Sequence, residues 1–371
     1  PDPLMKKKKI LINTGGGDAP GLNAVIRAVV LSAVNLGWEV WGIREGYRGI
    51  LAPDEFPRGG VIPLDLNAVS GITHLGGTIL GTTNRGNPLS FPVQNEAGDW
   101  IEIDRSQELT DYFERHGFDT LVAIGGDGSL TIADEIGRRS GINIIGVPKT
   151  IDNDLEGTIA TFGFDTAIDF ATECVDRLHT TAASHNRIMV VEVMGRYAGW
   201  IALFSGLAGT ADVILIPEIP FDINKVVGKC NERVADGRGF SIIMVGEGAK
   251  PIGGEISVIG KTIGQAERIG GMGHQVAHAV EQMTGQETRC VVLGHLLRGG
   301  SPTTRDRMLA LRFGTAAVRA IAEGQRNVMV GLNPPTISYI PLDQIAGKMK
   351  QVPLDSDSIL SARSMGICLG D

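Results

Sequence analysis

Three absences narrow the classes of protein that this sequence can represent. The four cysteines are widely spaced and form no CxxC pair, so we expect free thiols rather than a zinc ribbon or a disulfide framework. The sequence has no run of about 18 apolar residues and no apolar signal segment after Lys9, so neither a membrane span nor secretion is expected. Apart from residues 6–9 (KKKK), expected to be a solvated lead into a strand, nothing is strongly basic, and the net charge of −8 argues against a nucleic-acid partner. We therefore predict a cytoplasmic protein.

Glycine, in contrast, is abundant. The 51 glycines show no period, which excludes a fibrous fold. They occur in pairs after apolar runs, where the backbone must approach another group closely. With 43% hydrophobic and 20% charged residues, the chain of 371 residues can build an ordinary hydrophobic core. Its length predicts one large α/β unit or two medium lobes.

Short apolar runs alternate with helical patterns along most of the chain. Strands are predicted at residues 10–13, 40–43, 120–124, 143–147, 187–193, 213–216, 241–246 and 288–293. Helices are predicted at residues 21–36, 106–115, 129–139, 165–180, 272–284 and 303–323. Most of these strands lack hydrophobic alternation, which is typical of mostly parallel sheets with helices on both faces. Because eight strands would make one large sheet, we expect two α/β lobes, with a surface β-hairpin at residues 91–103.

Ligands of α/β sheets bind where strands end at their carboxyl edges, so functional residues are expected in the loops that follow the strands. The first loop, residues 15–21 (GGGDAPG), opens a helix. Glycines at such a turn let backbone N–H groups approach an anionic oxygen, aided by the helix N-terminus. A purely structural glycine turn is an equally good reading. The loop is neither a Walker A motif nor a GxGxxG fingerprint.

A second glycine loop, residues 125–129 (GGDGS), also opens a helix. It carries Asp127 where a phosphate-bound Mg²⁺ could lie. The alternative is that Asp127 only caps the helix N-terminus. Two such loops in one chain favour phosphate binding more than either loop does alone.

The most informative segment is residues 148–154 (PKTIDND). In an extended loop Asp152 and Asp154 can point the same way, with Thr150 beside them. Two carboxylates next to Lys149 suit a division of labour, in which one removes a hydroxyl proton and the other helps to hold a metal ion. The alternative is a solvated acidic turn.

Arginines follow two further strands, in MGRYAG (Arg196) and GHLLRGG (Arg298). A guanidinium at a strand end can bind a phosphate through two hydrogen bonds or neutralise charge during transfer. Each arginine could instead form a surface ion pair, and His295 could be a structural histidine. Glu247, which follows another strand, could accept hydrogen bonds from sugar hydroxyls.

Together these motifs resemble the ATP/pyrophosphate phosphofructokinase family. The segments GGGDAPGLNAVIR, GGDGS, PKTIDND, SHNR, VMGRYAG, ETR and GHLLRGGSP occur in family order between about residues 10 and 325. The resemblance implies a glycolytic kinase with two Rossmann-like lobes and the active site in the cleft between them. It implies a donor lobe of residues 6–163 plus 297–346, and a fructose 6-phosphate lobe of residues 164–296 plus 347–371. It also implies Mg²⁺ and ATP as co-substrate.

The resemblance assigns roles to individual positions. Asp152 matches the base that takes the proton of the sugar 1-hydroxyl, with Thr150 and Asp154 beside it, and Arg196 matches the group that stabilises the transferring phosphoryl. The positions matching donor and metal contacts are Gly17, Tyr47, Arg85, Asp127, Gly128, Ser129 and Lys149. Those matching sugar-phosphate contacts are Thr150, Asp152, Met194, Gly195, Arg196, Glu247, His295 and Arg298. Arg187 and Arg289 match residues that reach the 6-phosphate from a neighbouring subunit, which implies a homo-oligomer, either dimer or tetramer.

The donor cannot be read from a single position. Lys149 stands where the family's pyrophosphate enzymes carry lysine. Gly128, in contrast, is the residue of the ATP users, and pyrophosphate users usually carry aspartate at this position. A carboxylate there would repel the α-phosphate of a nucleotide. We expect ATP, in a subgroup with mixed donor-site residues. The family's arginine in the first lobe aligns with Asn84, and Arg85 is expected to replace it.

Regulation is expected to differ from that of the bacterial relatives. Their effector site uses a basic cluster, of which Arg27 and Arg177 remain here. Leu31 replaces one arginine, and residues 236–240 (DGRGF) replace a lysine-rich stretch. We therefore expect a weak response to phosphoenolpyruvate or ADP.

Three other functions were weighed. A reversible pyrophosphate-dependent phosphofructokinase would share nearly all of these residues. A noncatalytic sugar-phosphate or nucleotide sensor on the same fold would not need the base Asp152. A lipid or NAD kinase with a GGDG motif would share only residues 125–128.

Overall fold

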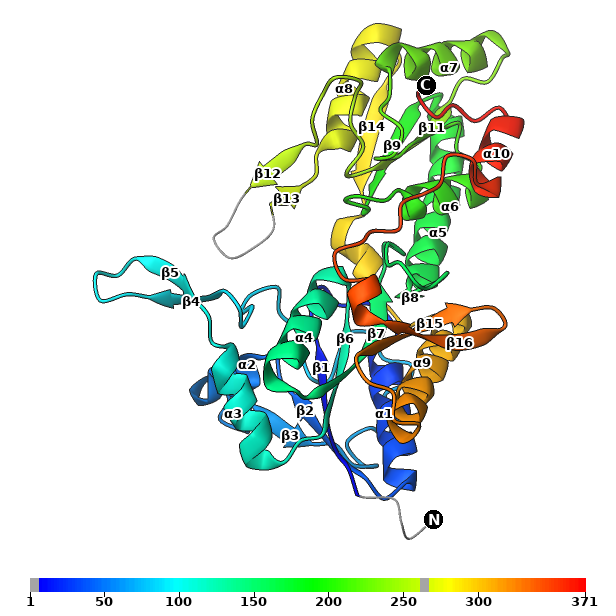
Figure 1. Ribbon diagram of the computed structural model, residues 1–371. Helices are drawn as coiled ribbons and strands as arrows, with labels where there is room; N and C mark the ends of the chain where they lie inside the picture. Colours follow the sequence, from blue (N-terminus) through cyan, green and yellow to red (C-terminus); the bar gives the residue numbers. More distant parts are fainter. Residues whose placement is uncertain (1–6, 261–266) are drawn as a thin grey trace.

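The computed structural model describes residues 7–260 and 267–371. Figure 1 shows two α/β units, one above the other, and each has helices on both sides of a central sheet. The predicted α/β architecture is therefore confirmed. Lys6, the predicted first residue of the donor lobe, lies outside the described residues. The exact division of the chain into a donor lobe and a sugar lobe stays a prediction.

The larger sheet has the strand order β16-β15-β7-β6-β1-β2-β3, with β8 paired to β7. The strands β15, β7, β6, β1 and β2 run parallel, and β16 and β3 are antiparallel at the edges. Their bounds are β1 Lys9–Thr14, β2 Glu39–Ile43, β3 Val61–Pro63, β6 Thr120–Gly125, β7 Asn143–Thr150, β8 Phe162–Gly163, β15 Val328–Asn333 and β16 Thr336–Pro341. Every residue of β6 and β7 is buried, as the absence of alternation predicted.

Helices cover both faces of this sheet. On one face α1 (Leu22–Asn35) and α9 (Thr304–Ala322) enclose a core of aliphatic side chains from β1, β6 and β7. On the other face lie α2 (Arg48–Leu51), α3 (Ser106–His116) and α4 (Asp127–Ser140). Both α3 and α4 end at a left-handed glycine, Gly117 and Gly141, because glycine adopts this conformation without a Cβ clash.

The smaller sheet is parallel throughout, in the order β10-β11-β9-β14. Its strands are β9 Ile188–Val193, β10 Val213–Leu215, β11 Ser241–Gly246 and β14 Thr288–Val292. One face packs on α5 (Phe164–His185) and α6 (Trp200–Ala208), and the other on α7 (Ile223–Ala235) and α8 (Met272–Thr284). The carboxyl ends of these strands face the larger sheet, so the loops of both sheets meet between the two units (Figure 1).

Two antiparallel hairpins project from the same side of the molecule (Figure 1). The first, β4 (Phe91–Gln94) and β5 (Trp100–Ile103), is the predicted surface hairpin and is confirmed. The second pairs β12 (Val258–Gly260) with β13 (Arg268–Ile269) and was not predicted.

The prediction also missed α6, α7, the edge strands β3 and β16, the strand β15 beside β16, and α10 (Asp357–Ser364). Helix α6 is apolar along most of its length (WIALFSGLA), so it has little of the amphipathic period that reveals a surface helix. The described residues also form three short 3₁₀ helices: η1 Pro53–Glu55, η2 Gly294–Arg298 and η3 Leu342–Gln344. From η3 the chain returns to the smaller sheet and ends beside it (Figure 1). In the described ranges, no helix combines the length and apolar character needed to span a membrane.

Candidate active site

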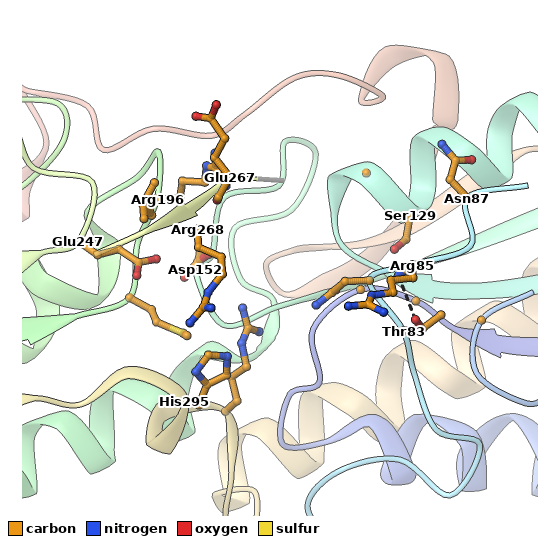
Figure 2. Close-up of a pocket in the computed structure, with 18 of the residues that line it drawn as sticks. Thr83, Arg85, Asn87, Ser129, Asp152, Arg196, Glu247, Glu267, Arg268 and His295 are labelled. Carbon is orange, nitrogen blue, oxygen red and sulfur yellow. Dashed lines mark hydrogen bonds between the residues drawn. The ribbon is translucent and has the colours of Figure 1, made fainter. Parts of the chain in front are cut away.

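A cavity of about 890 Å³ opens between the two sheets. Of the predicted site residues, it is lined by Tyr47, Arg85, Gly128, Ser129, Asp152, Met194, Arg196, Glu247, His295 and Arg298. A smaller adjoining cavity of about 320 Å³ adds Gly17. Figure 2 shows two groups of side chains in the main cavity. Arg85, Thr83 and Ser129 lie on one side, and Asp152, Arg196, Glu247 and His295 lie on the other.

The two predicted glycine loops lie against each other. A Cβ on Gly15 of the first loop would come 2.7 Å from the Oγ of Ser129 in the second loop. Within the second loop, a Cβ on Gly125 would come 2.3 Å from the Ser129 Cβ. These distances are below any real contact, so the loops can pack this closely only as glycines. A Cβ on Gly17 would similarly meet the Arg298 guanidinium at 2.5 Å. The glycines therefore have a structural reason as well as the predicted phosphate contact.

Gly128 differs from these glycines, since nothing lies within 4 Å of a Cβ built on it. It is the second residue of α4, its φ is not positive, and it faces the cavity. The space above this helix N-terminus is open to a ligand.

Asp127 does not cap helix α4, so that alternative is wrong. The N-cap is Gly126, and no side chain caps this end. Instead, Gly347 donates its backbone N–H to Asp127 Oδ1 at 3.0 Å. Burial raises the pKa of Asp127. Burial raises the pKa of Asp154 as well, and the negative charge of Asp127 makes a smaller contribution in the same direction. A cation shared by the two carboxylates would relieve their repulsion.

The segment predicted as a loop after Val147 begins as a strand, because β7 continues through Lys149 to Thr150. Asn153 then takes a left-handed conformation, with φ 52, and so turns the chain between the two aspartates. The backbone N–H of Asp152 donates to Thr150 Oγ1 at 3.0 Å. Asp152 Oδ1 is buried and accepts no hydrogen bond from the described residues. A solvated acidic turn is therefore excluded.

Charged groups of both signs act on the pKa values of the residues in this segment. Burial and the negative charge of Asp154 raise the pKa of Asp152, while Arg298 and Lys149 counteract this. Burial and, to a lesser extent, the positive charge of Arg298 lower the pKa of Lys149 to about 8. The Lys149 ammonium donates to the backbone carbonyl of Gly17 and so links β7 to the first glycine loop. Burial and, to a lesser extent, the negative charge of Asp152 raise the pKa of Glu247 to about 7.

The two predicted arginines are held by backbone carbonyls. Arg196 Nη1 donates to the Glu267 carbonyl at 2.7 Å, and Arg298 Nη1 donates to the Asp18 carbonyl at 3.2 Å. Arg196 Nε is buried without a partner in the described chain. No carboxylate forms an ion pair with either guanidinium among residues 7–260 and 267–371. The surface ion-pair alternative is therefore wrong for both arginines.

Arg187 and Arg289 are not among the residues that line the cavity. They lie at the amino ends of β9 and β14, whereas the cavity lies at the carboxyl ends. Arg187 Nε donates to Glu287 Oε2 at 2.7 Å, and Arg289 contacts the other oxygen of the same carboxylate. The chain's own fold thus separates these two cations from its own cavity.

Residues 347–350, near the C-terminus, form hydrogen bonds with the segments that carry Asp127 and Asp154. The sequence did not predict these contacts. Besides Gly347, Lys350 donates its backbone N–H to the carbonyl of Asp154 at 2.9 Å. The Lys350 ammonium donates to Asn153 Oδ1 at 3.2 Å and to the Thr158 carbonyl at 2.8 Å. No local pattern could have revealed these long-range contacts.

Glu192 and Arg268 also line the cavity and were missed. Glu192 had a usable signal, since it is a single charged residue inside the apolar strand β9 (IMVVEV). Arg268 had none. The remaining predicted residues, Thr150, Asp154, Asp127, Lys149 and Gly195, are not lining residues of the main cavity. They surround it in β7, in α4 and in the loops after β7 and β9.

Phosphoryl transfer is the chemistry that uses these groups together. Amides and a lysine bind phosphate oxygens, arginines stabilise the charge of the transition state, and a buried carboxylate takes a hydroxyl proton. Fold and cavity thus define an α/β phosphotransferase with its site between two sheets. Residues 9–321 match the family described as Phosphofructokinase. The chain belongs to the phosphofructokinase family.

Individual relatives agree with this family. The chain is 50% identical over 368 residues to the ATP-dependent 6-phosphofructokinase of Chloroflexus aggregans, covering 99% of both chains. It is 48% identical to ATP-dependent 6-phosphofructokinase 2 of Clostridium perfringens, covering 98% of this chain and 99% of the relative. Among solved structures, phosphofructokinase from Saccharomyces cerevisiae superimposes with a TM-score of 0.77 at 31% identity, covering 91% of this chain and 45% of that one.

Proposed function

We propose that this enzyme transfers the γ-phosphoryl group of ATP to the 1-hydroxyl of fructose 6-phosphate, giving fructose 1,6-bisphosphate and ADP. The observation that supports it best is the buried Asp152 oxygen without a hydrogen-bond partner in the described chain, which lies opposite the glycine loops of the same cavity. The names of the relatives from Chloroflexus and Clostridium support ATP as the donor. A cytoplasmic location, expected from the sequence, stays a prediction.

In this mechanism Asp152 accepts the proton of the 1-hydroxyl as the oxygen attacks the γ-phosphorus. The bond between the γ-phosphorus and the β,γ-bridging oxygen breaks, and ADP leaves. Arg196, whose Nε is unpartnered within the described ranges, stabilises the charge that spreads over the transferring phosphoryl oxygens. Glu247 and His295 hold the sugar on the Asp152 side of the cavity.

A Mg²⁺ ion fits the carboxylates present. Mg²⁺ commonly uses one or two carboxylates together with substrate phosphates and water. Asp127 and Asp154, whose charges repel each other, offer such a pair. The described residues contain no cluster of three or more His, Cys, Asp or Glu side chains for a protein-only metal site. When bound, the ion would neutralise charge on the donor phosphates.

The open space at Gly128 favours ATP over pyrophosphate, because a nucleotide needs room there for its α-phosphate. Steady-state rates with MgATP and with Mg-pyrophosphate, each at saturating fructose 6-phosphate, test the donor. We expect turnover with ATP and poor turnover with pyrophosphate. Faster turnover with pyrophosphate would instead make Lys149 the better indicator of the donor.

We further propose that the enzyme is a homo-oligomer in which Arg187 and Arg289 complete a neighbour's sugar-phosphate site. Both cations share Glu287 at the end of the sheet far from their own cavity. Two guanidinium groups converging on one carboxylate leave enough positive charge to bind a phosphate as well.

Replacing Arg187 tests this arrangement. Arg187→Ala should raise the KM for fructose 6-phosphate about tenfold or more, the usual effect of losing one charge-assisted hydrogen bond, and should leave the KM for ATP nearly unchanged. Arg363→Ala, which breaks an exposed ion pair with Asp371, is the matched control and should change neither. Mixed oligomers of Arg187→Ala and Asp152→Asn chains should show non-additive activity. A fully active monomer in sedimentation experiments contradicts the proposal.

A further inference from the structure

The β12–β13 hairpin is anchored to the wall of the cavity by three hydrogen bonds. The Glu267 carbonyl accepts from Arg196 Nη1 at 2.7 Å. Just beyond β13, the backbone N–H groups of Gly271 and Gly273 donate to the two oxygens of Glu192 at 3.1 Å and 2.7 Å. Glu192 is 2% exposed and accepts these bonds at the N-terminus of helix α8. The residues between these anchors are thereby fixed in place.

The backbone between β13 and α8 needs glycine. Gly270 has φ 145 and Gly271 has φ 86, and other residues rarely adopt these values. Through this turn the chain passes from the cavity wall into α8. Arg268 lies two residues before Gly270, paired in the hairpin with Gly260. Its backbone is therefore held on both sides.

The guanidinium of Arg268 has no partner among residues 7–260 and 267–371. Four arginines line the cavity: Arg85, Arg196, Arg268 and Arg298. Arg196 and Arg298 donate to backbone carbonyls. In the described part of the chain, Arg268 and Arg85 have neither a side-chain hydrogen bond nor an ion pair. The two differ in position: Arg85 lies near Thr83 and Ser129, whereas Arg268 points toward Asp152 and His295 (Figure 2).

This half of the cavity contains acidic side chains. Asp152 and Glu247 lie in it (Figure 2), and Glu192 also lines the cavity, so a phosphorylated sugar that enters here needs more than one cation. A guanidinium can give a phosphate two parallel hydrogen bonds. Arg268 is the cation of this half that is not already bonded within the described chain.

We propose that Arg268 binds the phosphate group of the sugar substrate, as a specificity residue that the β12–β13 hairpin adds to the acceptor half of the cavity. The proposal rests on the proposed function, because it takes fructose 6-phosphate to be the acceptor. It assigns Arg268 to substrate binding and assigns it no part in the proton transfer.

Kinetics of Arg268→Ala and Arg268→Lys test the assignment, with Arg58→Ala as the matched control. Arg58 is an exposed arginine outside the cavity. Arg268→Ala should raise the KM for fructose 6-phosphate by about 10-fold to 100-fold, as expected for a charge-assisted bond, with the KM for ATP changed less than about twofold. The KM of Arg268→Lys for fructose 6-phosphate should lie between those of the unmodified enzyme and Arg268→Ala, because lysine keeps the charge but loses the paired hydrogen bonds. Arg58→Ala should behave as the unmodified enzyme.

Calorimetric titration with fructose 6-phosphate, without donor, separates this proposal from the proposed function. Weaker binding to Arg268→Ala than to the unmodified protein supports the proposal whatever the donor is. Unchanged binding, or a rise in the KM for ATP alone, overturns it. An unmodified protein that binds fructose 6-phosphate but transfers no phosphoryl group to it would overturn the proposed function and leave the binding role of Arg268 standing.

Discussion

Asp152→Asn should lower kcat by a factor of about 10² to 10⁴, the usual contribution of a general base. The KM for fructose 6-phosphate should stay within a few-fold. The amide has almost the shape of the carboxylate, and the backbone N–H of residue 152 keeps its bond to Thr150 Oγ1. What is lost is the ability of the buried oxygen to take a proton. Stopped-flow or coupled steady-state assays at saturating substrates measure the effect. A loss of less than about tenfold would remove Asp152 from the role of base.

The pH dependence of kcat gives an independent measurement of the same group. Burial and the charge of Asp154 raise the pKa of Asp152, and the base works only when it is deprotonated. Activity should therefore fall as the pH decreases through this raised pKa, at a higher pH than an ordinary aspartate would allow. Asp154→Asn removes the neighbouring negative charge, so the acid limb should move to lower pH. An acid limb that does not move would show that another group controls it.

Gly128→Asp should abolish most turnover with ATP, with a fall in kcat/KM of about 10²-fold or more. A carboxylate near phosphate oxygens in a partly desolvated cleft adds several kcal/mol of repulsion, on the order of 4 kcal/mol at 4 Å and an effective dielectric constant of 20. The new side chain should not disturb folding, because a Cβ at Gly128 has no neighbour within 4 Å and the residue has no positive φ.

Gly128→Ala is the matched control for this substitution. It adds the Cβ without the charge, and it should retain most of the activity with ATP. Thermal unfolding of both variants checks that the fold is intact. If Gly128→Asp keeps normal ATP turnover, the α-phosphate does not pass near α4, and the argument from open space at this position is wrong.

The sequence predicted best those features that depend on local patterns. Runs without hydrophobic alternation, such as β6 and β7, identified the buried parallel strands. The glycine loops identified the edge of the sheet at which the cavity opens. The predicted extent of β7 was wrong, because Pro148 and Lys149 are disfavoured in strands by propensity. Burial against the rest of the sheet overrides that preference.

Long-range contacts account for what the sequence could not predict. Arg268 enters the cavity only because Glu192, 81 residues before Gly273, holds the start of α8. Asp127 looks like a helix cap in the sequence, and its actual partner is Gly347. Such pairings depend on how the two sheets meet, and one sequence contains no pattern that reports it.

The contacts from residues 347–350 also order events during biosynthesis. Gly347 donates a hydrogen bond to Asp127, which lies 220 residues earlier in the chain and is translated long before it. Translation proceeds at about 5–20 residues per second. On the order of ten seconds or more would therefore pass between the synthesis of Asp127 and Asp154 and that of their partners, Gly347 and Lys350. The two aspartates and Asn153 would be held only when Lys350 had left the exit tunnel. The chain would therefore acquire its phosphotransferase geometry late in synthesis, well after α4, which begins at Asp127, and β7, which precedes Asp154, had been made.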